Sequence, residues 1–330
     1  MRAPAAPLSA SAVVIGAIAV EHPALVREVE ELESLHLLDS PAAQLRDSGF
    51  AQCRIAEVPA STLAHRAVQR LLADGRIAAE SVQLLVTASA MPTSSVVPRD
   101  GALSIMEHPP SGLDLTCYGS TRVQHELGLV NARTLGITEL GCVALLEAVW
   151  LAHRLMDQEG WDTAVCVSAD VMPPGLKREV LHSLMSDAGC AVLLTRGPGG
   201  HRLLHHAQMT KGFYWDAQAC RNELLAAYYP TARRLIANAL AHCGLTLDDI
   251  ACVLPNNVSR RSWEALCAVL RLPIERVYTD NIARHGHAMG ADQFINLQDA
   301  VRAGRVRRGD RALLFGFGLG AHWACSVVEV

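Results

Sequence analysis

The chain has 330 residues, of which 50% are hydrophobic, 19% charged and 5% aromatic, and its formal net charge is −4 with neutral histidines. This composition excludes an intrinsically disordered chain, a collagen-like chain and a small disulfide-bonded scaffold. The length predicts two domains, or one large fold built from two halves, with a core that needs no covalent crosslink. The charge balance gives no reason to expect binding to nucleic acid or to an anionic membrane.

The first expected element is a buried strand at residues 12–20. The start of the chain resembles a signal peptide, because Arg2 precedes an apolar run. However, that run continues directly into a polar, helix-like stretch at residues 21–38, so we interpret it as a strand and keep secretion as the alternative. No run reaches the roughly 18 continuous apolar residues of a membrane-spanning helix. The ten cysteines include no Cys-X-X-Cys pair, which favours free thiols in a reducing cytoplasm.

Along the rest of the chain, short apolar runs alternate with longer helical patterns. This alternation predicts an α/β layered fold. The expected strands are residues 82–89, 165–168, 190–194, 250–254, 311–315 and 324–330, and the expected helices are residues 61–72, 142–156, 229–242 and 262–270.

The two halves of the chain have similar patterns. Each carries a helix, then a strand preceded by acidic residues (Glu80 and Asp248), then a further helix and a final pair of strands. We therefore predict an N-terminal half at residues 1–198 and a C-terminal half at residues 199–330, separated by a Gly- and His-rich joint at 197–206. The three histidines of this joint are expected to lie in a solvated linker rather than at a metal ion, because no Cys, Asp or Glu cluster stands beside them at ligand spacing.

Cys142 differs from the other cysteines in its context. It follows Gly141, and a long helical pattern begins immediately after it. The positive end of a helix dipole and the free N–H groups of a first turn favour a thiolate. The same N–H groups can stabilise an oxyanion. This context indicates a nucleophilic cysteine, with core packing as the alternative.

A second candidate cluster lies at residues 283–292, where His285 and His287 stand in a turn interrupted by glycine. Asp292 comes five positions after His287 and can reach its ring if the turn opens into a helix. A carboxylate at that place would fix the imidazole tautomer and raise its basicity, giving a Cys/His/Asp set. The alternative is a surface loop in which Asp292 caps a helix.

These residues together resemble the thiolase superfamily, specifically ketoacyl-acyl-carrier-protein synthase III, over nearly the whole chain. The resemblance implies a thiolase fold with two similar halves in a layered α-β-α-β-α architecture. The matching stretches are residues 121–128 (TRVQHELG), 141–142 (GC), 186–189 (SDAG), 254–257 (LPNN), 284–287 (RHGH) and 317–323 (FGLGAHW).

The resemblance also implies roles for single residues. Cys142 matches the nucleophile, and its N–H with that of Leu319 would form the oxyanion hole. Arg261 matches an arginine near the pantetheine entrance. The family's catalytic His and Asn are exchanged here, because Asn256 stands at the position of the His and His287 at the position of the Asn. The set Cys142, His287 and Asp292 is similar to that of diverged synthase III-like acyltransferases of polyketide and antibiotic pathways.

Three functions follow as hypotheses. The leading one is an acyltransferase that moves an acyl group from a carrier-protein or coenzyme A thioester, through an acyl-enzyme on Cys142, to a hydroxyl, amine or thiol acceptor in secondary metabolism. The alternative is a decarboxylative condensing enzyme that works with the exchanged His and Asn. The third is a non-catalytic partner subunit. For the first two, the resemblance implies acyl-CoA or acyl-phosphopantetheine as donor, no permanently bound cofactor, and a homodimer, or a heterodimer with a related subunit. The free thiols indicate a cytoplasmic location, and no metal site is expected.

Overall fold

The computed structural model describes residues 12–74 and 77–330, so residues 1–11 and 75–76, including most of the leader-like segment, lie outside the described residues. The first main sheet has the strand order β1-β9-β6-β4-β5. Strand β4 pairs in parallel with both β5 and β6, whereas β9 is antiparallel to β6 and β1. The bounds are β1 Val13–Glu21, β4 Leu84–Ala88, β5 Arg133–Ile137, β6 Thr163–Asp170 and β9 Ala188–Arg196.

The second main sheet has the order β10-β13-β12-β11. Strands β11 and β12 are parallel, and β13 is antiparallel to β12 and β10. An isolated parallel bridge between Val253 and Val277 adds a fifth position beside β11. With that bridge, the second sheet repeats the order and directions of the first. The bounds are β10 Arg202–Thr210, β11 Ile250–Leu254, β12 Arg311–Gly318 and β13 His322–Glu329.

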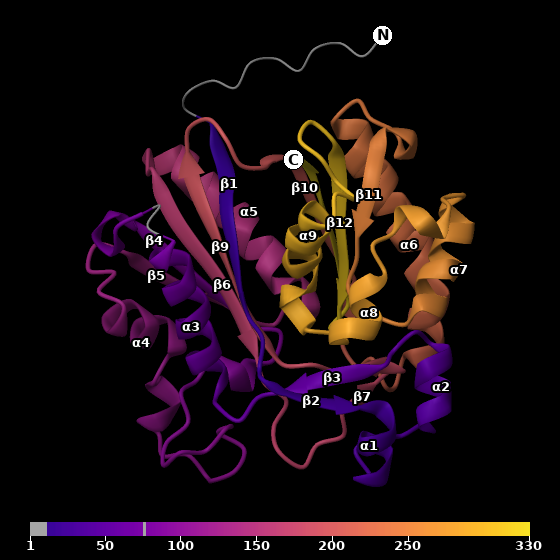
Figure 1. The fold of residues 1–330 in the computed structure, drawn as a ribbon, viewed down its shortest axis with the longest axis horizontal. Coiled ribbons are helices and arrows are strands. Elements are labelled where there is room, and N and C mark those ends of the chain that lie inside the picture. Colours follow the sequence, from indigo (N-terminus) through magenta and orange to yellow (C-terminus); the bar gives the residue numbers. More distant parts are fainter. Residues whose placement is uncertain (1–11, 75–76) are drawn as a thin grey trace.

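Helices cover and separate the two sheets in five layers (Figure 1). Helices α3 and α4 pack on the outer side of the first sheet, α5 and α9 lie between the sheets, and α6 packs with α7 on the outer side of the second sheet. The bounds are α3 Ala60–Ala73, α4 Gly119–Glu126, α5 Ala144–Glu159, α6 Arg221–His242, α7 Arg260–Leu270 and α9 Asp292–Arg302.

Smaller elements lie below the main sheets in Figure 1. Two short antiparallel sheets pair β2 with β3 and β7 with β8. The bounds are β2 Leu25–Glu28, β3 Gln52–Ile55, β7 Glu179–Val180, β8 Ser183–Leu184, α1 Val29–Ser34, α2 Ala42–Asp47 and α8 Asp280–His285.

The central core is the apolar contact of α5 and α9 with the two sheets. It includes Leu146 of α5, Phe294 of α9, Val192 of β9 and Leu314 of β12, all fully buried. Burying each such side chain stabilises the fold by about 1.5–3 kcal/mol. Because a helix between two sheets must be apolar on both sides, the nearly continuous apolar run after Cys142 becomes α5.

The predicted α/β layered architecture with two similar halves is confirmed, whereas two local predictions were wrong. Residues 21–38 are not one helix, since β2 precedes the short α1. The joint at 197–206 is not a solvated linker, because β10 begins at Arg202. The division at residues 198 and 199 falls between β9 and β10, and the duplication stays a proposal. Within the described residues, no helix combines the length and apolar character needed to cross a membrane.

The histidines of that joint have separate environments. His201 pairs with Ile15 through the backbone, and the ring of His205 stacks on His242 at 4.0 Å. His206 is buried, with Nε2 at 2.9 Å from Glu147 and Nδ1 at 2.8 Å from a serine hydroxyl of β13. Single-sequence periodicity missed β10 because its burial does not alternate strictly.

Candidate active site

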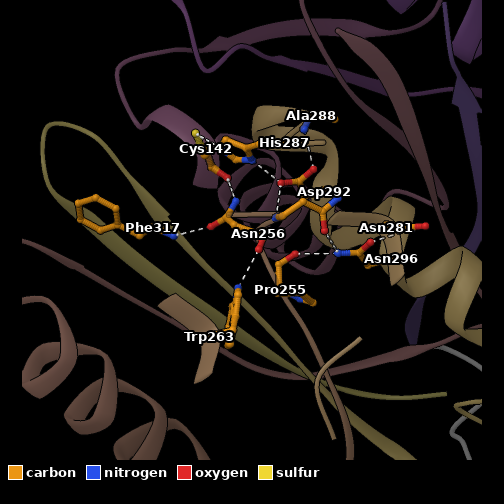
Figure 2. Close-up of polar contacts among 11 residues, drawn as sticks. Cys142, Pro255, Asn256, Trp263, Asn281, His287, Ala288, Asp292, Asn296 and Phe317 are labelled. Atoms are coloured by element: carbon orange, nitrogen blue, oxygen red, sulfur yellow. Dashed lines mark hydrogen bonds and ion pairs between the residues drawn. The ribbon is translucent and has the colours of Figure 1, made fainter. Parts of the chain in front are cut away.

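The candidate site residues follow the carboxyl ends of the parallel strands. Cys142 comes after β5, Asn256 two residues after the end of β11, and Leu319 directly after β12. In open α/β sheets, the loops at these ends are where ligands bind. The two sheets direct these ends toward one place, so residues from both halves of the chain meet there (Figure 2).

Cys142 lies in a tight single turn, Gly141–Val143, that leads into α5. Gly141 has φ +55°, and a Cβ on it would come within 3.0 Å of the Gly318 Cα and the Leu319 nitrogen. A Cβ on Gly318 would come within 3.1 Å of the Cys142 nitrogen. The two backbones can approach this closely only because both positions are glycine. The Cys142 thiol stays partly exposed, while six of the other cysteines are buried.

His287 joins the thiol to a carboxylate. Its Nε2 lies 3.2 Å from Cys142 Sγ, and its Nδ1 lies 2.5 Å from Asp292 Oδ2 (Figure 2). The backbone of His287 is held by a parallel bridge to Met185. This geometry is that of a nucleophile, a base and a group that orients the base.

Asp292 is fully buried, and its carboxylate is surrounded by N–H donors. Oδ2 accepts from His287 Nδ1 and from the Asn257 N–H at 2.7 Å, and Oδ1 accepts from the Ala288 N–H at 2.8 Å. These three donors hold the carboxylate in one orientation. The carboxylate therefore fixes the proton of the imidazole on Nδ1, which leaves Nε2 facing the sulfur.

The pKa of His287 reflects competing causes. Burial lowers the pKa, but the charges of Cys142 and Asp292 and their hydrogen bonds raise it, and the result lies well above the ordinary value. A raised pKa favours the imidazolium form of His287 in the free protein. The direction agrees with the contacts, since both neighbours carry or can carry negative charge.

Asn256 contacts backbone at both ends of its amide. Because Phe317 offers an N–H, the side-chain oxygen must face it, at 2.7 Å. The amide nitrogen then donates to the Cys142 carbonyl at 3.4 Å. Asn256 thus connects the end of β12 to the turn that carries the thiol, without contacting the imidazole through a hydrogen bond.

Behind Asp292 lies a buried chain of asparagines, drawn in Figure 2. Asn296 donates to Asn257 Oδ1 and to the Pro255 carbonyl, each at 2.9 Å, and accepts from Asn281 at 2.8 Å. These contacts fix residues 255–257, whose Asn257 N–H holds the carboxylate of Asp292. Sequence reasoning missed this network, although Asn296 stands four positions after Asp292 on the same face of α9.

A cavity of about 520 Å³ opens beside the site. Its lining includes the apolar side chains of Leu319, Val180 and Leu181 and the charged side chains of Glu179 and Arg221. Its volume is in the range of small-molecule sites. Arg261 is not among the lining residues; it lies exposed at the start of α7, 3.4 Å from Asp47.

A further feature that sequence reasoning missed is a cluster of methionines against Cys142. Met172, Met185 and Met289 are buried there, and Met91 packs beside them. A signal was available in the sequence, because Met91 and Met172 closely follow β4 and β6, which are parallel neighbours. Across residues 12–74 and 77–330, no group of three or more His, Cys, Asp or Glu is placed to hold a metal ion.

Comparison of the sequence with known proteins finds similarity to ketoacyl-acyl-carrier-protein synthases III. Residues 240–330 match the family described as 3-oxoacyl-acyl-carrier-protein (ACP) synthase III C terminal. Over 310 residues the chain is 24% identical to beta-ketoacyl-acyl-carrier-protein synthase III of Caldanaerobacter subterraneus subsp. tengcongensis, covering 86% of this chain and 87% of that protein.

Solved structures give the same result for the fold. The 3-oxoacyl-acyl-carrier-protein synthase III of Aquifex aeolicus VF5 superposes with a TM-score of 0.80 at 20% identity, covering 96% of this chain and 100% of that one. ChlB3, described as an acyltransferase, superposes with a TM-score of 0.82 at 22% identity, covering 96% and 97%. The chain therefore has the thiolase fold in the form found in ketoacyl-acyl-carrier-protein synthase III.

Proposed function

We propose that the protein is an acyltransferase that moves an acyl group through a thioester on Cys142 to a nucleophilic acceptor. The observation that carries this proposal is the position of His287, with Nε2 at 3.2 Å from the thiol and Nδ1 at 2.5 Å from a fully buried carboxylate. An imidazole with a carboxylate behind it is suited to take a proton from an alcohol, amine or thiol.

In the first half-reaction, the Cys142 thiolate attacks the carbonyl carbon of a thioester donor. The carbon–sulfur bond to the donor breaks, and the departing thiolate takes the proton of the His287 imidazolium. The N–H groups of Cys142 and Leu319, which the contact of Gly141 with Gly318 brings together, would stabilise the oxyanion. Such donors are worth about 10²–10³ in rate.

Formation of the acyl-enzyme changes the imidazole. The charge on Cys142 helps to raise the pKa of His287 in the free protein. Acylation removes that charge, so burial then opposes Asp292 alone and the pKa falls. His287 becomes a neutral base at the moment when the acceptor needs one.

In the second half-reaction, His287 Nε2 takes the proton of the acceptor as the acceptor attacks the acyl carbon. Cys142 leaves as a thiolate, and the thiolate–imidazolium pair is restored. We assign Asn256 a positioning role, since its amide joins the Cys142 carbonyl to the Phe317 N–H. Arg261 would contact the carrier or phosphate of the donor.

A second candidate is decarboxylative condensation. It is favoured by the synthase III relatives and by Asn256 next to the thiol turn. Condensation needs two donors on the malonyl thioester carbonyl, whereas here Nδ1 of the imidazole bonds a carboxylate and Nε2 is placed to act as a base. Release of CO₂ from malonyl thioester would support condensation against plain acyl transfer.

We also propose acyl-CoA or an acyl carrier protein as donor, a role in secondary metabolism, a cytoplasmic location and a homodimer. The ten free cysteines fit a reducing compartment. The edge strand β5, with Leu135 exposed, offers a surface for a second copy. Light scattering of the purified chain tests the dimer.

The test of the proposal is intact-protein mass spectrometry after incubation with acyl-CoA and acyl-carrier donors. We expect one acyl adduct, which Cys142→Ala removes and the matched variant Cys117→Ala keeps, since both thiols are partly exposed. Addition of acceptors should discharge the adduct in the wild type and not in His287→Gln. Absence of an adduct with every donor class would refute the proposal and support a non-catalytic subunit.

A further inference from the structure

Gln293 is a buried polar side chain in the first turn of α9, next to Asp292. It has no exposed surface, and neither its amide nitrogen nor its amide oxygen has a hydrogen-bond partner among the described residues. Asp292 and Asn296 of the same helix differ, because both polar atoms of each side chain are hydrogen-bonded. Burial of an unpaired amide lowers the stability of a fold. The presence of Gln293 therefore calls for an explanation other than stability.

Gly316 of β12 makes room for the Gln293 amide. A Cβ on Gly316 would come within 2.4 Å of Gln293 Nε2 and within 2.7 Å of Asn256 Oδ1. The same Cβ would come within 3.0 Å of Val143, the residue that follows Cys142. The two amides therefore lie side by side over the backbone of β12, close to the turn that carries the thiol. They can approach this backbone only because residue 316 has no side chain.

The side-chain oxygen of Asn256 can accept a second hydrogen bond. One bond already comes from the Phe317 N–H, at 2.7 Å, and an amide oxygen has two lone pairs. Nε2 of Gln293 is a donor placed beside this oxygen. Contacts of this kind are often long in a free enzyme and shorten in the complex with substrate.

From this geometry we propose that Gln293 is a positioning residue of the acyl transfer, which holds the Asn256 amide in the orientation that joins the Phe317 N–H to the Cys142 carbonyl. The bond from Asn256 to that carbonyl is long, at 3.4 Å, so a second contact on the amide oxygen helps to fix the turn of the thiol. The inference rests on the proposed function, because its effect is measured on the acyl-enzyme at Cys142.

The effect should fall on the rate of the reaction and not on donor binding. Gln293 is not among the residues that line the cavity beside Leu319, whereas Asn256 contacts the backbone of the nucleophile. Loss of one amide hydrogen bond corresponds to a rate loss of about 3- to 10-fold. Removal of the amide should at the same time stabilise the fold, because its cost of burial disappears.

The experiment compares Gln293→Met with the wild type. Methionine is unbranched like glutamine and close to it in size, but it has no amide. Quenched-flow mass spectrometry follows adduct formation on Cys142 over a range of acyl-CoA concentrations. We expect the maximal rate to fall about 3- to 10-fold, while the donor concentration that gives half of this rate stays unchanged. The midpoint temperature of thermal unfolding should rise by about 2–5 °C.

The matched control is Gln298→Met, which makes the same substitution in the same helix. The amide of Gln298 is paired, since it donates to the Ile18 carbonyl. Gln298→Met should therefore lower the midpoint temperature, because this acceptor loses its donor. It should keep the wild-type rates within about twofold, because it is distant from the reacting groups. The same change of residue type thus has opposite effects on stability at the two positions.

A double-mutant cycle tests whether Gln293 acts through Asn256. Asn256→Ala removes the amide that Gln293 is proposed to hold. In that background, Gln293→Met should change the maximal rate by less than about twofold, because its partner is already absent. Gln293→Leu, which also lacks the amide, replaces Gln293→Met if the methionine variant does not fold.

Three results would overturn this inference alone: an unchanged maximal rate in Gln293→Met, a lowered midpoint temperature in that variant, or the same rate loss with and without the Asn256 side chain. Failure of every donor to form an adduct with the wild type would overturn the proposed function together with the inference. The outcomes are distinguishable because the wild-type adduct is measured first.

Discussion

Replacement of Asp292 by asparagine tests the link between the carboxylate and the imidazole. The wild-type side chain accepts three N–H donors, from His287, Asn257 and Ala288. Asparagine has the same shape but one acceptor, so its NH₂ group must face one set of donors. If the amide oxygen stays with Ala288, the NH₂ group faces His287 Nδ1 and favours the tautomer with the proton on Nε2. That tautomer cannot act as a base toward the thiol or the acceptor.

The magnitude follows from the hydrogen bond that the substitution removes. The charge-assisted bond from Nδ1 is worth about 1.5–3 kcal/mol. Reversal of the tautomer against the new amide donor costs about as much again. The sum of roughly 3–6 kcal/mol corresponds to a rate loss of about 10²–10⁴. The upper end agrees with the loss of about 10⁴ known for the same change in a serine-protease triad.

The assay follows adduct formation and adduct discharge separately, and both should slow in Asp292→Asn. The matched control is Glu147→Gln, which alters another carboxylate–histidine contact, at 2.9 Å to His206, away from the thiol. We expect the control to keep the wild-type rates within about twofold, because it does not touch the reacting groups. If Asp292→Asn formed the adduct within about tenfold of the wild-type rate, the assigned role of the carboxylate would be wrong.

Three further outcomes are expected. Gly318→Ala should abolish activity and lower the midpoint temperature of unfolding, because the added Cβ would overlap a backbone oxygen. Gly136→Ala should be tolerated, because its added Cβ lies 3.9 Å from the nearest atom. Thermal unfolding and adduct formation are measured for both variants. Asn296→Ala should lower the free energy of unfolding, measured in urea, by about 2–4 kcal/mol and should slow adduct discharge. The reason is that the Pro255 carbonyl and Asn257 Oδ1, both buried acceptors, lose their donor. Unchanged stability would contradict the role of the asparagine network. Since the folded pKa of His287 is raised, its contribution to stability is complete below the unfolded pKa of about 6.5 and is lost as pH rises through the higher folded value. The excess stability of wild type over His287→Gln should therefore shrink above a pH of about 6.5, and a difference independent of pH would contradict the raised pKa of His287.

The layered fold could be predicted because buried strands and helices show clear patterns of apolar residues in the sequence. Strand β11, bounded by Ile250 and Leu254, is fully apolar and coincides with the expected range. Strand β5 was missed because it is an exposed edge strand with mixed residues. Strand β10 was missed because its histidines find partners, such as Glu147 for His206, that are distant in sequence. Propensity carries no information about such contacts.

Some features of the candidate site could likewise be predicted from the sequence, and others could not. The thiol and the imidazole–carboxylate pair were predictable because each has a local signature, a glycine before Cys142 and a five-residue step from His287 to Asp292. The partners of Asn256 were not predictable, since the Phe317 N–H reaches it only through the parallel pairing of β11 with β12. The methionines belong to four separate loops, and their meeting depends on strand order rather than on any motif.

The contacts of positions 256 and 287 give a physical reason for the exchange of His and Asn inferred from the sequence. The side chain at 256 faces the Phe317 N–H and the Cys142 carbonyl, and neither of these hydrogen bonds reaches a carboxylate. The side chain at 287 precedes the first turn of α9, where Asp292 lies within hydrogen-bond distance. Of positions 256 and 287, only 287 gives a histidine a carboxylate partner, and the basicity of that histidine then depends on whether the sulfur beside it is charged. In the proposed function, this imidazole would alternate between acid and base, which is a different task from holding an enolate with two neutral donors.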